Sequence, residues 1–298
     1  MTGYLSDREG IISLWQEGFS DGRADVELFL DKLFCDENYF YIKQNGKILS
    51  QAFVVPVSLK GREEVFNGYY FCCAVTARGA RGKGYMANII ERVKKTAEQR
   101  DMDFVALIPA NRSLFDFYSK FGFERFFYCD EREVMPEATR DTDLDGGKIL
   151  PISFCKTNDA QLLFDLQNEA FGLRGVPKNE LSDHGFYEGT IIKSRAIFDY
   201  LVKDAALSGY EIYAVGQNGE TLGFIFYDPA CNLIREFMLP SGREDILSLF
   251  AKSVAGRSVT VREKANGFDS PKGMVYAIND RVKELGRSYP FINNLLES

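Results

Sequence analysis

The segment 71–86, FCCAVTARGARGKGYM, constrains the fold of this 298-residue chain more than any other. Its first part is strand-like, and the basic turn that follows contains Gly82 and Gly84. Glycine lets the backbone turn tightly and present its N–H groups to an anion. After the turn, apolar residues recur at helical spacing: Ile89, Ile90, Val93 and Ala97. The segment therefore predicts a strand, an anion-binding loop and a helix whose positive end faces the loop.

A glycine-rich turn by itself is a weak indication of a ligand site, because Arg-Gly-Lys-Gly also suits a solvated turn between a strand and a helix. The loop lacks the Lys-Ser/Thr ending of a nucleotide-hydrolase P-loop, which disfavours ATP or GTP with magnesium. A second motif lies at 109–127, PANRSLFDFYSKFGFERFF, after the strand-like FVALI of 104–108. Asn111 is predicted to cap a helix in this motif, and Gly122 to end it.

Together the two motifs resemble the GNAT family of N-acetyltransferases. That family carries Arg/Gln-x-x-Gly-x-Gly/Ala after its fourth strand, and this sequence has Arg81, Gly84 and Met86 at those positions. The large side chain of Met86, at the position where the family has Gly or Ala, resembles the enhanced-intracellular-survival (Eis) branch of the family. Downstream the family has an Asn seven positions before a Tyr and then Lys-x-Gly-Phe, matched here by Asn111, Tyr118, Lys120, Gly122 and Phe123. The resemblance covers the first half of the chain strongly and the second half in outline.

The resemblance implies acetyl-CoA as co-substrate and no metal. The residues expected to bind the coenzyme are Ala74, Val75, Thr76, Arg81, Gly82, Lys83, Gly84, Tyr85, Met86 and Asn111. Tyr118 is expected to be the general acid that protonates the thiolate leaving group, although without the motif a core tyrosine would be the more ordinary interpretation. A ping-pong nucleophile at Cys72 or Cys73 is disfavoured, because the only histidine, His184, lies in the other half and reads as a surface residue.

Composition narrows the partners and the compartment. A formal net charge of −7 disfavours nucleic acid and favours a cationic substrate. Six cysteines without a CxxC pair, mostly inside apolar runs, predict reduced core thiols and, with one histidine, no metal site. The start, MTGYLSDREG, lacks the apolar core of a signal peptide, and no apolar run approaches the roughly 18 residues of a membrane span. We expect a cytoplasmic protein without a membrane span, and homo-oligomer formation stays open.

The length suggests two domains of about 150 residues each. Residues 1–130 are expected to form the catalytic domain, 131–147 a linker, and 148–298 a degenerate GNAT-like domain with an acceptor-site or structural role. Asn-Gly pairs predict a hairpin in each half, and 191–207 is predicted to be helical. The segment 240–244, PSGRE, stands where a second phosphate loop would be and lacks its spacing. The expected fold is α/β with a mixed sheet, in two tandem GNAT-like domains.

The expected function is transfer of the acetyl group of acetyl-CoA directly to a primary amine of a small molecule or peptide. The alternative is a non-catalytic protein that senses acyl-CoA or binds a partner through its second half. The sequence leaves open the identity of the amine and the general base. It also leaves open whether the C-terminal carboxylate reaches the site, as the Eis resemblance suggests.

Overall fold

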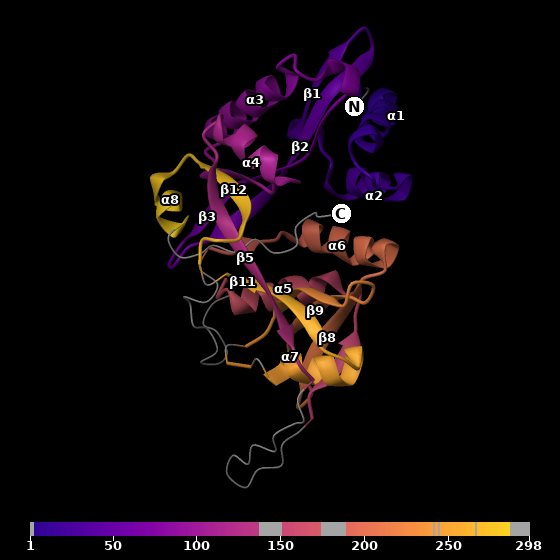
Figure 1. Ribbon diagram of the computed structural model, residues 1–298, viewed down its shortest axis with the longest axis vertical. Coiled ribbons are helices and arrows are strands. Elements are labelled where there is room, and N and C mark those ends of the chain that lie inside the picture. Colours follow the sequence, from indigo (N-terminus) through magenta and orange to yellow (C-terminus); the bar gives the residue numbers. More distant parts are fainter. Residues whose placement is uncertain are drawn as a thin grey trace.

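The computed structural model describes residues 3–136, 151–173, 189–240, 242–243, 245–265 and 267–286. These residues form two lobes, with helices packed on strands in each (Figure 1). The first part of the chain contains α1 (Gly3–Gly18), α2 (Arg23–Leu33), β1 (Tyr39–Gln44), β2 (Lys47–Lys60), β3 (Val65–Thr76), α3 (Tyr85–Gln99), β4 (Phe104–Leu107), α4 (Arg112–Ser119) and β5 (Glu124–Val134).

The second part adds β6 (Ser153–Lys156), α5 (Ala160–Ala170), β7 (Ile191–Ile192), α6 (Arg195–Ser208), β8 (Glu211–Gln217), β9 (Glu220–Asp228), β10 (Leu233–Met238), α7 (Asp245–Phe250), β11 (Val259–Lys264), β12 (Pro271–Ala277) and α8 (Asp280–Leu285). The described strands join into one mixed sheet in the order β1-β2-β3-β4-β12-β5-β11-β10-β9-β8-β6, and β7 pairs with β2. The predicted α/β class with a mixed sheet is therefore confirmed. No helix in the described ranges is long and apolar enough to cross a membrane.

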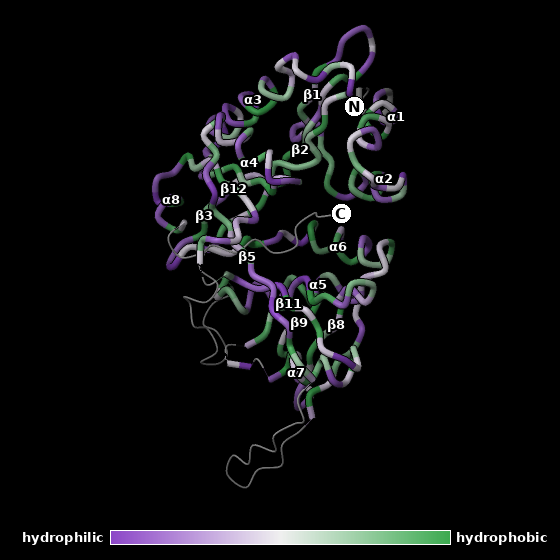
Figure 2. The backbone as a smooth tube through the Cα atoms, viewed as in Figure 1, coloured by the Kyte–Doolittle hydropathy of each residue, from purple (hydrophilic) through white to green (hydrophobic). Residues whose placement is uncertain are grey.

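The two predicted hairpins are present. Asn45 and Gly46 turn between β1 and β2 with φ of 49° and 76°, and Asn218 and Gly219 turn between β8 and β9 with φ of 58° and 80°. Two consecutive left-handed residues are what a tight hairpin between right-twisted strands requires, and Asn-Gly adopts them at low cost. Long apolar stretches of β2 and β9 follow these turns (Figure 2). Each hairpin thus joins two neighbouring antiparallel strands of the sheet.

Helices cover both faces of the first lobe's sheet. Alternate residues of β3 point to opposite faces, so Tyr70 and Cys72 pack with α1 and α2, whereas Tyr69 and Phe71 pack with α3 and α4. The core on the α1 and α2 face continues without a break into α5 and α6 of the second lobe. The two lobes therefore share one hydrophobic core.

The strand β5 crosses from one lobe to the other. Its first residues pair with β12, with Glu124 opposite Val275, and its last six pair with β11, from Cys129 opposite Lys264 to Val134 opposite Val259. The strand thus continues past residue 131, where the sequence predicted a linker. Residues 137–147 of that linker lie outside the described part of the chain.

The strand β12 also joins the two halves of the chain. β12 comes from the end of the second half but lies between β4 and β5 of the first lobe, with Met274 opposite Leu107. Without it, β4 and β5 would each expose an unpaired edge, and unpaired backbone groups in a core are costly. The residues that complete the first lobe's sheet are therefore far from it in sequence.

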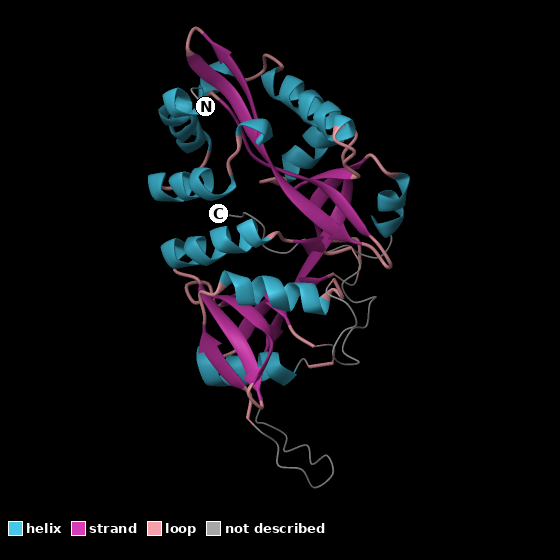
Figure 3. Ribbon diagram, turned by 180° about the vertical axis from the view of Figure 1, so that it is seen from behind, coloured by secondary structure: helices cyan, strands magenta, loops and turns pink. Residues whose placement is uncertain are grey.

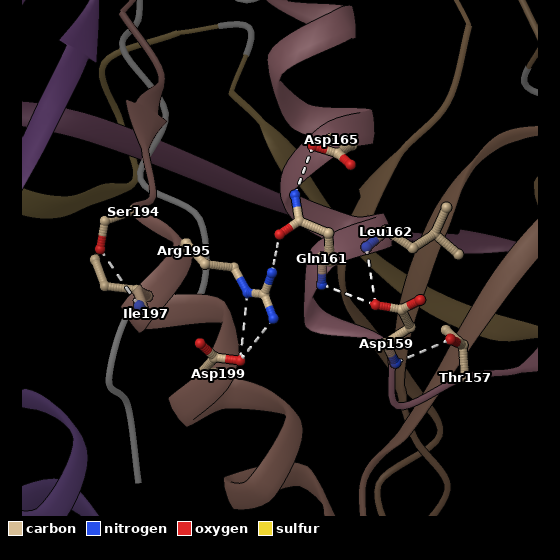
Figure 4. A network of polar contacts seen from close by, with 9 residues as sticks. All are labelled: Thr157, Asp159, Gln161, Leu162, Asp165, Ser194, Arg195, Ile197 and Asp199. Atoms are coloured by element: carbon tan, nitrogen blue, oxygen red, sulfur yellow. Dashed lines mark hydrogen bonds and ion pairs between the residues drawn. The ribbon is translucent and has the colours of Figure 1, made fainter.

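The second lobe contacts the first mainly through α6, which packs beside α2 when seen from behind (Figure 3). The rings of Phe29 and Tyr200 meet edge to face at 6.1 Å. The helix predicted at 191–207 begins only at Arg195, because Ile191 and Ile192 pair with β2 instead and Ser194 then caps the helix. Asp159 caps α5 in the same way, and Arg195 links the two helix starts by binding Gln161 and Asp199 (Figure 4).

Candidate functional site

The glycine-rich loop has the predicted form. A single turn at Arg78–Ala80 leads into the loop, and α3 begins at Tyr85 directly after Gly84. Gly82 and Gly84 have φ of 75° and 78°, in the left-handed region. Nothing lies within 4 Å of a Cβ added at either position. The backbone conformation, and not lack of space, is therefore what favours glycine here.

Bonds to the sheet and to α1 fix the loop. Arg81 donates from Nε to the Thr76 carbonyl at 3.1 Å, and the Arg78 backbone N–H donates to the Glu17 carboxylate at 2.6 Å. Lys83 is exposed, and Tyr85 donates its hydroxyl to Gln44 at 3.3 Å. The result is an exposed basic loop at the N-terminal end of a 15-residue helix, which is a geometry suited to a phosphate group.

The strand β3 extends beyond the end of its pairing with its parallel neighbour, β4. Pairing with β4 covers only Gly68 to Tyr70, whereas β3 continues to Thr76. In the described chain no strand pairs with residues 71–76 on that side. The register with β2 also shifts here, and Cys73 has a left-handed φ of 54°. Ala74, Val75 and Thr76 thus lie on a splayed, bulged strand, the position at which the sequence predicted backbone contacts to the coenzyme.

The second motif folds as predicted. The Asn111 side chain caps α4 by accepting from the Ser113 N–H at 3.1 Å, and Gly122 ends the helix with φ of 84°. Tyr118 is buried, and its ring lies 6.3 Å from that of Phe71. Burial raises the pKa of Tyr118 to about 12. The phenol therefore stays protonated at neutral pH, as a proton donor must.

A cavity of about 480 Å³ lies on the opposite face of the sheet, between the lobes. The first lobe contributes side chains near α1 and α2 and the splayed part of β3, and the second contributes α6 and Tyr210. The side chains that line the cavity include Asp21, Asp25, Cys72, Cys73, Tyr200 and Asp204. Its volume falls in the range of small-molecule sites. Because Cys73 lies at the bulge, the cavity reaches the point where β3 separates from β4.

Three carboxylates line this cavity, and the sequence analysis singled out none of them. Asp21 accepts from the Trp15 ring N–H at 2.6 Å, and Asp25 accepts from the Gly22 backbone N–H at 2.8 Å. Burial first, and then the nearby Asp25, raise the pKa of Asp204 to about 6. Asp204 lies some 180 residues from Asp21 and Asp25, roughly the length of a whole domain, and only the α2–α6 packing brings them together.

The cysteines differ in part from expectation. All six are free, but Cys35, Cys155 and Cys231 are exposed, so the prediction of core thiols is wrong for these three. Burial and the adjacent Cys72 thiol raise the pKa of Cys73 well above its ordinary value. A thiol held in its neutral form is a poor nucleophile, which agrees with direct transfer. Within the described ranges, no three His, Cys, Asp or Glu side chains gather as metal ligands would.

Two regions considered in the sequence analysis are not among the described residues. His184 and the C-terminal residues 287–298 lie outside the described part of the chain. Tyr118 packs in the core formed with α3 and α4 and is absent from the lining of the cavity, whereas Phe71, its ring neighbour, is part of that lining. Tyr118 thus lies on the α3 and α4 face of the sheet, the cavity lies on the α1 and α2 face, and the splayed end of β3 lies between them.

Comparison with known proteins agrees with this geometry. Residues 4–126 match the family model described as an acetyltransferase (GNAT) domain. Similar solved structures include a probable N-acyltransferase from Enterococcus faecalis V583 (TM-score 0.69, 15% identity, 93% of this chain and 71% of that one). They also include a GCN5-related N-acetyltransferase from Kribbella flavida (0.66, 14%, 93% and 70%) and Eis1 from Mycobacterium abscessus (0.64, 10%, 92% and 72%). No curated protein matches the chain in sequence.

Proposed function

We propose that this chain, whose residues 4–126 match the GNAT acetyltransferase domain model, transfers the acetyl group of acetyl-CoA directly to a cationic primary amine. The observation that carries the proposal is that the interlobe cavity reaches the bulge at Cys73, where β3 separates from β4. A donor on one face of the sheet and an acceptor on the other meet at this opening.

The loop residues and the splayed strand are the proposed coenzyme site. The backbone of Gly82 to Met86 and the side chains of Arg81 and Lys83 hold the pyrophosphate at the start of α3. The backbone of Ala74 to Thr76, on the edge of β3 with which no described strand pairs, binds the amides of the pantetheine arm, as an added strand would. Asn111 caps α4 beside this arm. The thioester then lies near Cys73 and Tyr118.

The cavity is the proposed amine site. Its three carboxylates favour a cation, and Lys272 is the basic residue in its lining. The aromatic side chains of Trp15, Tyr70 and Tyr210 also line the cavity, and the Tyr210 ring already binds one cation, the guanidinium of Arg235, at 4.1 Å. Attack by the amine nitrogen on the thioester expels a thiolate, and Tyr118 is proposed to protonate it.

Thiol release from acetyl-CoA tests the proposal. The purified chain is assayed with monoamines, diamines, polyamines and peptides, and each product is identified by mass spectrometry. We expect thiol release above the hydrolysis background with at least one cationic amine, coupled one to one to an acetylated product. Saturable coenzyme binding without amine-dependent release would instead support the sensor alternative.

A further inference from the structure

We propose that Asp204, on α6 of the second lobe, is the group that accepts the proton from the attacking amine. The inference rests on the proposed acetyl transfer and adds a catalytic residue to it. Both lobes would then contribute to the active site, because the proposed coenzyme site belongs to the first lobe and the base belongs to the second. The second lobe would then take part in the chemistry and not only shape the acceptor site.

The position of Asp204 is set by the packing of the lobes. One face of α6 lines the cavity, through the residues Tyr200, Asp204 and Ser208, which follow at four-residue spacing. Tyr200 is buried against Phe29 of α2, which fixes this face of the helix. Across the same cavity lie Cys72 and Cys73 of the splayed strand. Asp204 therefore lines the same cavity as the part of β3 beside which the thioester is proposed to lie.

Asp204 differs from the other two carboxylates in how its oxygens are bound. Asp21 and Asp25 each accept one short bond, at 2.6 Å from the Trp15 ring N–H and at 2.8 Å from the Gly22 backbone N–H. In the described structure the one hydrogen bond to Asp204 comes from the Tyr200 hydroxyl at 3.4 Å, a long and weak contact. The carboxylate of Asp204 is therefore the least tightly hydrogen-bonded of the three.

The charges that face Asp204 come from several elements. Asp25 of α2 and the preceding Asp21 disfavour its ionisation, whereas Tyr200 on its own helix and Arg235 of β10 favour it. Tyr210, Lys272 and the thiols of β3 complete the titratable groups around the cavity. Burial, the largest cause, acts together with these charges and raises the pKa of Asp204 to about 6. Asp204 is therefore ionised at neutral pH and can accept a proton from the amine.

The protons balance in this scheme. The bound ammonium gives its first proton to Asp204, which later passes it to solvent. The neutral nitrogen forms the C–N bond to the acetyl carbon, and the C–S bond breaks. The thiolate takes a proton from Tyr118, and Tyr118 is reprotonated by the second nitrogen proton as the amide forms. The net products are the amide, the free thiol and one released proton.

The test is the variant Asp204→Asn, which keeps the shape and removes the base. With a strongly basic amine we expect kcat/KM to fall on the order of 10²- to 10⁴-fold, with unchanged affinity for acetyl-CoA. We expect the acid limb of the wild-type pH profile, near pH 6, to disappear. With a weakly basic amine that is already neutral at pH 7, the defect should nearly vanish, because no proton needs to be removed before attack.

Two matched variants separate this role from electrostatics and from folding. Asp21→Asn removes a charge from the same cavity, and we expect a higher KM for the amine with the acid limb retained. Asp199→Asn, one turn earlier on α6 and outside the cavity lining, should leave kcat/KM unchanged. If Asp204→Asn does not fold, Asp204→Ala replaces it, and added formate should restore part of its turnover.

The outcomes distinguish this inference from the proposed function. A wild-type chain that acetylates no amine overturns the proposed function and the inference with it. An active wild type whose Asp204→Asn variant keeps its rate and acid limb overturns the inference alone. An equal loss of rate with strongly and weakly basic amines also overturns it, because that result shows a structural role.

Discussion

The two lobes place a parallel strand pair at corresponding positions, and only one pair leads into a loop fit for a coenzyme. In the first lobe, β3 and β4 are parallel, and the segment after β3 carries two left-handed glycines into the 15-residue α3. In the second lobe, β10 and β11 are parallel, but the helix that follows β10 carries Asp245 in its first turn and changes from the six-residue α7 into a π-helix at Ala251–Ala255.

An acidic residue at a helix start occupies the place that a phosphate would take. Arg243 binds Asp245 at 2.9 Å, so even the basic side chain here is engaged within the chain. The difference agrees with the proposal that the first lobe holds the donor site, while the second contributes the α6 face to the cavity. Substitutions in each lobe test this division of roles between the lobes.

The largest effect is expected for Gly84→Asp in the loop. A carboxylate beside the pyrophosphate repels it, so acetyl-CoA binding measured by calorimetry should fall below detection. Gly84→Asn serves as control, since it places a side chain of the same shape at φ of 78° without the charge and should retain measurable binding. In the second lobe, Gly242→Asp should leave coenzyme affinity unchanged. Two coenzymes bound per chain would break the comparison.

A smaller effect is expected for Tyr118→Phe. If Tyr118 protonates the thiolate, kcat should fall by roughly ten- to ten-thousandfold while the Kd of acetyl-CoA stays the same. The matched control is Tyr213→Phe in the second lobe, a buried tyrosine whose hydroxyl binds Glu211. Pre-steady-state measurement of thiol release separates chemistry from product release. Wild-type kcat under chemistry-limited conditions would make Tyr118 a packing residue.

Salt concentration should change the KM for the amine more than it changes the rate of acetyl transfer. Because the cavity carries three carboxylates, the KM for a cationic amine should rise severalfold when salt is increased from about 0.05 M to 0.5 M, over which the Debye length shortens markedly. The variant Asp25→Asn should show a flatter salt dependence. A KM independent of salt would show that these carboxylates do not face the amine.

The smallest effect concerns stability. The folded pKa of Asp204, about 6, lies above the ordinary value of 3.8, so between these pH values the folded state binds more protons than the unfolded state. The free energy of unfolding therefore falls as pH rises through this window. Asp204→Asn should raise Tm at pH 7 by a few degrees, about 2–4 °C per kcal/mol, and leave it unchanged below the window. Differential scanning fluorimetry across pH checks this, and a lower Tm at pH 7 would contradict it.

Local chemistry made the first lobe largely predictable from the sequence. The Asn45-Gly46 turn, the Asn111 cap and the Gly84 loop each fix backbone geometry within a few residues, and the sequence shows them directly. β12 was missed because its Met274 and Val275 become a strand only when the edges of β4 and β5 are present to pair with them. Asp204 was missed for the same kind of reason, since a half-exposed aspartate on a helix carries no sign of the distant Asp25.

The insertion of β12 between β4 and β5 also has a consequence for biosynthesis. The ribosome completes β5 at Val134, and β12 begins only at Pro271, 137 residues later (271 − 134). At translation rates of roughly 5–20 residues per second, about 7–27 s pass before the strand that fills the gap between β4 and β5 is synthesised. The lobe that carries the glycine-rich loop, although encoded first, therefore completes its sheet only near the end of synthesis.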